Sequence, residues 1–201
     1  MQTTLAQSTS PSISGFTATL PGKLLLGLAA TAVVAAAAHV AIPLPFTPVP
    51  FILTPLAVLG VGLALGPVTG FFTLLAYLAE GAMGLPVFSP TGPGGIAQLF
   101  GPTGGYLMAY PLVAAIAGGL AQFLVRRTPR FLAATVAGTV AIAFLFVCGA
   151  AWFMQYAGHS LQATWIGSVA PFLPGEAVKI LAAAGIYSAV TRSTRAQTPH
   201  S

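Results

Sequence analysis

The chain has 201 residues, of which 56% are hydrophobic and only 4% are charged, and its formal net charge is +5. Soluble proteins carry roughly 25% charged residues, so this composition excludes a soluble globular protein and predicts an integral membrane protein. The few basic residues are scattered along the chain, which excludes a nucleic-acid-binding surface. The length suits one compact membrane bundle without a separate soluble domain.

Residues 1–22 are rich in Ser, Thr, Gln and Pro and show no periodic pattern, so we expect a disordered cytoplasmic tail. An apolar stretch at 24–42 then has about the length of a membrane-spanning helix. It contains Ala32 and Ala36, and small residues at this spacing let another helix approach closely. Two placements stay open for these alanines, one inside the bundle and one against a partner subunit.

Residues 42–50 contain four prolines and are expected to form a stiff loop. We predict short helices over 51–65 and 68–83, joined by a tight turn at Gly66-Pro67. Glu80 lies near the end of the second of these helices. A carboxylate at this position either contacts a substrate or lies among the lipid head groups.

The longest irregular segment between the predicted spans is 84–105. Irregular backbone at membrane depth is tolerated where it is buried in protein or lines a cavity. Glycines such as Gly95 permit close approach of the backbone to a ligand, and Phe88 and Tyr106 offer aromatic walls. The segment is therefore interpreted as a cover over a binding pocket, with a plain connector as the alternative.

The remaining helices complete an all-α bundle of six transmembrane helices over residues 23–192. They are predicted at 106–125, 131–156 and 174–191, with a short interfacial helix at 160–169 and a polar cytoplasmic tail at 193–201. Six spans place both termini on one side of the membrane. The loops predicted on the other side contain no Lys or Arg, so the positive-inside rule places both termini in the cytoplasm.

Glu176 is one of only two acidic residues in the chain, and it stands three positions before Lys179 in an apolar run. At this spacing the two side chains lie on one face of a helix. Charges within a membrane are expensive unless they face each other, a cavity or a ligand. We therefore predict a substrate-binding site at this pair; a purely structural ion pair, or two side chains that extend to the interface, is the alternative.

Four motifs together resemble the BioY family, the biotin-binding S component of energy-coupling-factor (ECF) transporters. They are, in order, Ile42-Pro43-Leu44-Pro45-Phe46-Thr47-Pro48-Val49-Pro50, Gly84-Leu85-Pro86-Val87-Phe88, Gly101-Pro102-Thr103-Gly104-Gly105-Tyr106 and Pro171-Phe172-Leu173-Pro174-Gly175-Glu176-Ala177-Val178-Lys179. The resemblance covers about Leu24 to Val190. It implies a six-helix protein of the cytoplasmic membrane that captures biotin from outside.

The resemblance also implies a docking partner, namely a transmembrane coupling protein that carries two cytosolic ATPases, although some family members are reported to work without it. It assigns partner docking to Ala32 and Ala36 and substrate binding to Glu176 and Lys179. No cofactor or metal is expected. With the residues discussed above, the candidate substrate-binding set is Glu176, Lys179, Tyr106, Gly95, Phe88 and Glu80.

Two departures from the family pattern bear on the site. Glu176 stands where the family usually has Asp, so its carboxylate reaches one methylene further. Ile52 and Thr54 replace the usual Thr and Gln, so no ligand contact carries over to them. Biotin still suits the pair, because Glu176 can accept hydrogen bonds from ureido N–H groups, while Lys179 can donate to the carbonyl or neutralise the carboxylate tail.

Three other readings compete with biotin uptake. One is an S component for a different vitamin. Another is an intramembrane enzyme that uses Glu80, Glu176 and Lys179, with His39 as a further candidate; the absence of a Gly-x-Ser-x-Gly or His-Glu-x-x-His motif speaks against it. A passive channel is disfavoured because one ion pair lines no continuous polar path.

Overall fold

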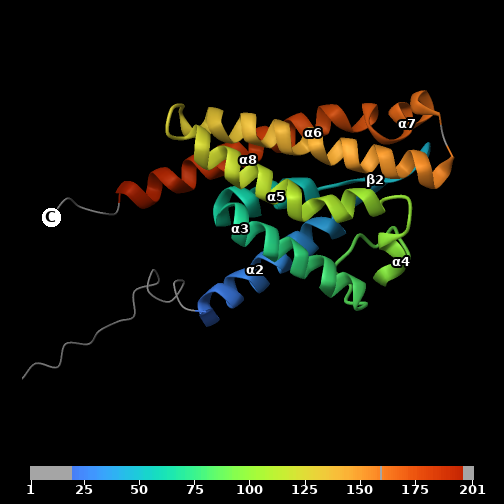
Figure 1. The fold of residues 1–201 in the computed structure, drawn as a ribbon, viewed down its shortest axis with the longest axis horizontal. Helices are drawn as coiled ribbons and strands as arrows, with labels where there is room; N and C mark the ends of the chain where they lie inside the picture. Colours follow the sequence, from blue (N-terminus) through green and yellow to red (C-terminus); the bar gives the residue numbers. More distant parts are fainter. Residues whose placement is uncertain (1–19, 159, 197–201) are drawn as a thin grey trace, which may run out of the picture.

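The computed structural model describes residues 20–158 and 160–196, which form a bundle of apolar helices with one small β-hairpin (Figure 1). Four helical stretches are long and apolar enough to cross a membrane, and 24–39 adds a shorter apolar helix. The predicted all-α membrane fold is therefore confirmed. The elements are α2 (Leu20–His39), β1 (Ala41–Leu44), β2 (Thr47–Ile52), α3 (Thr54–Ala82), α4 (Gly95–Leu99), α5 (Gly104–Leu124), α6 (Arg130–Ala157), α7 (Leu161–Ser168), the 3₁₀ turn η1 (Ala170–Phe172) and α8 (Leu173–Ala196).

The predicted tails overlap only partly with the described residues. Positions 1–19 of the N-terminal tail and 197–201 of the C-terminal tail lie outside them. Helix α2 already begins at Leu20, and α8 continues to Ala196, beyond its predicted end near Thr191. The short helix predicted at 160–169 is present as α7.

Helix α3 reverses its direction in the middle. Gly66 has φ 79° and ψ 179°, a conformation that residues with a side chain rarely adopt, and Pro67 follows it. A Cβ on Gly70 would lie 3.3 Å from the Cα of Gly62. In a continuous α-helix eight residues span roughly 12 Å, so the two halves of α3 must lie side by side. The predicted turn at Gly66-Pro67 is thus confirmed. Among the described residues, the six long helical segments are α2, the two halves of α3, α5, α6 and α8.

Close packing of α3 on α5 depends on missing side chains. A Cβ on Gly118 would lie 2.4 Å from the carbonyl oxygen of Gly62, and one on Gly62 would lie 2.3 Å from that of Ala114. Membrane helices gain little from the hydrophobic effect against each other, so small residues that allow backbone contact supply much of the packing. Around this centre α6 packs on α5, α8 packs on α6 and α3, and α2 packs on α3.

Residues 41–52 form an antiparallel hairpin, which corrects the predicted proline-stiffened loop. Ile42 pairs with Phe51, and the register shifts between Ile42 and Leu44. The intervening Pro43 has no N–H for the ladder and keeps Ile42 out of the helical region. Helix α2 therefore ends at His39 rather than at the predicted residue 42.

The irregular elements gather at one end of the bundle. The hairpin, α4 and α7 lie opposite the end at which α2 begins and α8 finishes (Figure 1). At that second end Arg126 and Arg127 follow α5, and Arg130 donates a 3.0 Å hydrogen bond to the carbonyl oxygen of Thr191. Across residues 20–158 and 160–196, Lys179 is the one Lys or Arg away from the second end.

Candidate substrate-binding site

A cavity of about 350 Å³ lies at the hairpin end of the bundle. Its volume is within the range of small-molecule sites. The apolar part of the wall includes Leu44, Val49, Leu107, Leu145, Phe146 and Phe172. The polar side chains in the lining are those of Thr47, Thr54, Tyr77, Ser89, Thr91, Gln98, Thr103, Tyr106, Tyr110, Ser168 and Glu176. A cavity with largely apolar walls and a few polar groups suits a compact, partly polar ligand.

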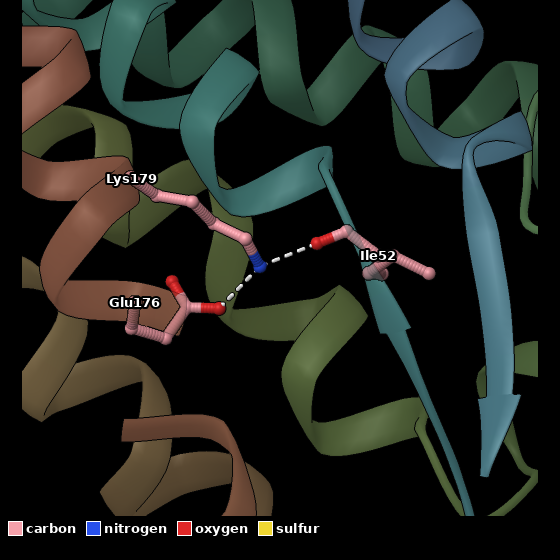
Figure 2. A network of polar contacts seen from close by, with 3 residues as sticks. All are labelled: Ile52, Glu176 and Lys179. Atoms are coloured by element: carbon pink, nitrogen blue, oxygen red, sulfur yellow. Dashed lines mark hydrogen bonds and ion pairs between the residues drawn. The ribbon is translucent and has the colours of Figure 1, made fainter. Parts of the chain in front are cut away.

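Glu176 brings a carboxylate to this wall from the first turn of α8. The positive end of the helix dipole favours an acidic group there. Lys179 Nζ lies 2.7 Å from Glu176 Oε1 and also donates to the carbonyl oxygen of Ile52 (Figure 2). Glu176 and Lys179 are 5% and 4% exposed, and Glu176 Oε2 has no hydrogen-bond partner. One carboxylate oxygen is therefore held by the protein, and the other is unused.

Lys179 is enclosed on its remaining side by an aromatic ring. Its Nζ lies 4.1 Å from the centroid of the Phe51 ring, which stacks on Phe172. A Cβ on Gly175 would lie 2.3 Å from that ring, so the glycine of the Pro-Gly-Glu sequence makes room for Phe51. The lysine is thus surrounded by a carboxylate, a carbonyl and a π face, and it does not belong to the cavity lining.

The segment between α3 and α5 folds over the cavity with its own hydrogen bonds. Gln98 is buried in α4; its Nε2 donates to the carbonyl oxygen of Ser89 at 3.2 Å, and its Oε1 accepts from the backbone N–H of Gly94 at 3.1 Å. A Cβ on Gly92 would lie 2.7 Å from the Gln98 side chain. Trp152 of α6 donates to the carbonyl oxygen of Gly101 at 2.8 Å. The segment is therefore ordered, and residues within it, such as Gln98, form part of the cavity wall.

Tyr106 joins this wall to α7. Its hydroxyl donates a 2.6 Å hydrogen bond to the carbonyl oxygen of Ser168. A Cβ on Gly149 would lie 2.2 Å from the Tyr106 ring, so the close approach of α6 keeps the ring in place. Both Tyr106 and Ser168 line the cavity.

A comparison with known protein families gives a match over most of the chain. The model of the BioY family matches residues 8–196. The chain belongs to the BioY family. The resemblance seen in the sequence motifs is therefore confirmed.

Other BioY proteins are similar over most of their length. The Biotin transporter BioY of Rhizobium etli is 33% identical over 174 residues, which are 83% of this chain and 91% of that protein. The Biotin transporter BioY of Rhodobacter capsulatus is 36% identical over 166 residues, which are 78% and 86% of the two chains. A crystal structure of the S-component for biotin from an ECF-type ABC transporter matches with a TM-score of 0.77 and 26% identity, covering 85% of this chain and 90% of that one.

The predicted substrate-binding residues separate into two groups in this BioY chain. Glu176 and Tyr106 line the cavity, and Lys179 lies directly behind Glu176. Phe88 is buried against Tyr77 and Gly81 behind the lining, with ring centroids of Phe88 and Tyr77 5.5 Å apart. Phe88 therefore lies behind the cavity wall rather than on it, because Gly81 has no side chain and leaves room for the Phe88 ring.

Gly95 and Glu80 also lie off the lining. Gly95 begins α4 with φ 58°, so its conformational freedom serves the turn into that helix. Glu80 Oε1 accepts a 3.1 Å hydrogen bond from Thr31, which joins α3 to α2. His39 is exposed, with Nδ1 2.8 Å from the carbonyl oxygen of Ala35. Glu80 and His39 thus have other partners than the Glu176–Lys179 pair, and a BioY protein is a transporter component rather than an enzyme.

Ala32 and Ala36 are exposed on α2. The buried stripe of that helix runs along another face and consists of Thr31, Val34 and Ala38. The placement of the alanines inside the bundle is therefore excluded. A surface of small side chains is left facing outward on α2.

Most of the polar lining residues had no place in the predicted site, and Thr54, Gln98 and Tyr110 are examples. Their positions depend on where α3, α4 and α5 begin relative to one another, which no local pattern specifies. Gln98 is a single polar residue among Ile96, Ala97, Leu99 and Phe100, and this pattern could have indicated a polar group with a specific role.

Proposed function

We propose that this chain captures biotin and serves biotin uptake as the substrate-binding S component of an ECF-type transporter. The observation that supports the proposal most directly is the buried Glu176–Lys179 pair, in which Glu176 lines a largely apolar cavity and keeps one carboxylate oxygen without a partner. It occurs in a chain of the BioY family whose relatives are named biotin transporters.

The cavity suits the two chemical halves of biotin. The fused ureido ring carries two N–H donors, and a carboxylate oxygen that accepts from one of them makes a charge-assisted hydrogen bond in a dry site. The thioether ring and the aliphatic tail are apolar and suit walls such as Phe146, Phe172 and Leu145. In this arrangement Lys179 acts mainly by orienting Glu176, because its ammonium group is already bonded to Glu176 and Ile52.

The cavity end of the bundle is assigned to the outside of the cytoplasmic membrane, and both termini to the cytoplasm. This orientation follows from the arginines, which lie at the opposite end of the bundle, since basic residues are enriched on the cytoplasmic side. Biotin then enters the cavity from outside the cell.

Energised transport is assigned to partners. The S component is one part of an ECF transporter, and we propose a transmembrane coupling protein with two cytosolic ATPases as its partner. Ala32 and Ala36 on the exposed face of α2 are the proposed contact, because small side chains let a partner helix approach closely.

Equilibrium binding of labelled biotin to the purified protein in detergent tests the proposed function. Saturable binding that excess unlabelled biotin abolishes, and that riboflavin, thiamine and lipoate leave unchanged, is the expected result. Competition by one of these three vitamins in place of biotin would assign the chain to a different substrate. Absence of binding to monodisperse protein would remove the proposal.

A further inference from the structure

Thr54 carries a buried hydroxyl that no protein group uses. The residue is 1% exposed, lines the cavity, and its Oγ1 has no hydrogen-bond partner. A buried hydroxyl without a partner costs free energy, roughly 1–3 kcal/mol in protein mutational series. Among the described residues, Thr164 Oγ1 and Glu176 Oε2 are the other buried side-chain atoms in this condition.

The usual structural uses of a threonine hydroxyl do not apply to Thr54. Near the start of a helix a threonine commonly serves as the N-cap, but Leu53 holds that position in α3, without a side-chain cap hydrogen bond. Within helices the hydroxyl commonly donates to a carbonyl one turn earlier. Several threonines of this chain do so, namely Thr31, Thr128, Thr135, Thr139 and Thr191.

Thr54 and Glu176 line the same cavity, and each has a side-chain oxygen without a hydrogen-bond partner. They come from the first turns of α3 and α8. Tyr110 of α5 lines the same cavity. The two oxygens without a partner therefore belong to residues of one cavity wall.

Their chemistry differs in the way that one edge of a cyclic urea requires. A carboxylate oxygen only accepts hydrogen bonds, whereas a hydroxyl can also donate one. A cyclic urea presents an N–H and the carbonyl side by side on each edge. Lys179, the donor expected from the sequence to meet the carbonyl, is already bonded to Glu176 and to the carbonyl of Ile52.

We propose that the Thr54 hydroxyl donates to the ureido carbonyl of the ligand while Glu176 Oε2 accepts from the adjacent N–H, which makes Thr54 a specificity-determining residue for a cyclic urea. This inference rests on the proposed function. The unpaired hydroxyl then lowers the stability of the ligand-free protein, and it makes binding selective for a ligand that can accept its hydrogen bond.

The test compares Thr54→Val, which removes only the hydroxyl, with Thr54→Ser, which retains it. Thr54→Val should weaken biotin binding about 10- to 100-fold, because the ligand carbonyl is then buried without a partner. Thr54→Ser should bind biotin with an affinity within about threefold of that of the wild type, because it keeps the hydroxyl. Thr164→Val is the matched control, since its hydroxyl is equally buried and unpartnered but does not line the cavity.

Two ligand analogues separate a direct contact from a structural effect. Desthiobiotin keeps the ureido group and should show the same loss with Thr54→Val as biotin. In 2-thiobiotin a weakly accepting sulfur replaces the carbonyl oxygen, so the loss should shrink to about threefold or less. The melting temperature of the ligand-free protein should be unchanged or higher in Thr54→Val, because an unsatisfied buried group has been removed.

Wild-type binding tests the proposed function, and the Thr54 variants test the contact. If wild-type protein binds biotin and Thr54→Val binds it equally well, Thr54 is not a ligand contact, while the proposed function stands. An equal loss for biotin and 2-thiobiotin, with a lower melting temperature, would also overturn the contact. If wild-type protein binds no biotin, the proposed function and this inference fail together.

Discussion

Removing either member of the Glu176–Lys179 pair should abolish most biotin binding. The two side chains are about 7% and 5% exposed and their charged atoms are 2.7 Å apart, so loss of one leaves the other buried without its partner. Such a loss costs about 3–5 kcal/mol, and each 1.4 kcal/mol is a factor of ten in affinity. We therefore expect Glu176→Gln and Lys179→Ala each to weaken binding roughly a thousandfold, since the first removes the accepting charge and the second removes the group that orients Glu176.

Labelled biotin binding to purified variants in detergent measures this effect, and size-exclusion chromatography reports whether each variant stays folded. Arg130→Ala is the control for loss of a charge at the opposite end of the bundle, and it should bind normally. The double variant Glu176→Gln/Lys179→Met should regain stability without regaining affinity, because no buried charge remains. If both single variants are monodisperse and bind biotin like the wild type, the pair is structural and the site is misplaced.

Three further predictions concern topology, docking and packing. With the native cysteine replaced by serine, a cysteine at Thr91 should react with an impermeant thiol reagent in intact cells, whereas one in the α5–α6 turn should react only after lysis; the reverse pattern would invert the orientation. Changing Ala32 and Ala36 to Trp should leave biotin affinity intact but reduce uptake and co-purification with a coupling protein, and lost affinity would contradict their outward placement. Gly62→Ala should lower the free energy of unfolding by about 1–3 kcal/mol, because its Cβ would lie 2.3 Å from a backbone oxygen. A lower melting temperature in detergent would report this loss. Gly60→Ala, whose Cβ meets no atom within 4 Å, should have little effect, and equal effects of the two would refute the packing argument.

Several features of this protein were determined by the sequence alone because their physics is local. Only 4% of the residues are charged, and that composition excludes a water-facing surface whatever the fold. The reversal of α3 follows from Gly66-Pro67, since a positive φ and a missing N–H act within two residues. The pairing of Glu176 with Lys179 follows from helix geometry, because residues three apart share a face.

Other features depend on contacts between distant parts of the chain. Lys179 turns away from the cavity because its second partner is the carbonyl of Ile52, 127 residues away in the chain. Phe88 lies behind the cavity wall because Gly81 leaves space for its ring. The hairpin at 41–52 needs a partner strand that satisfies its backbone, and proline-rich composition alone does not reveal such pairing. Thr54 becomes part of the site only when α3, α5 and α8 converge, since a hydroxyl acquires a ligand-binding role from the cavity around it and not from its neighbours in the chain.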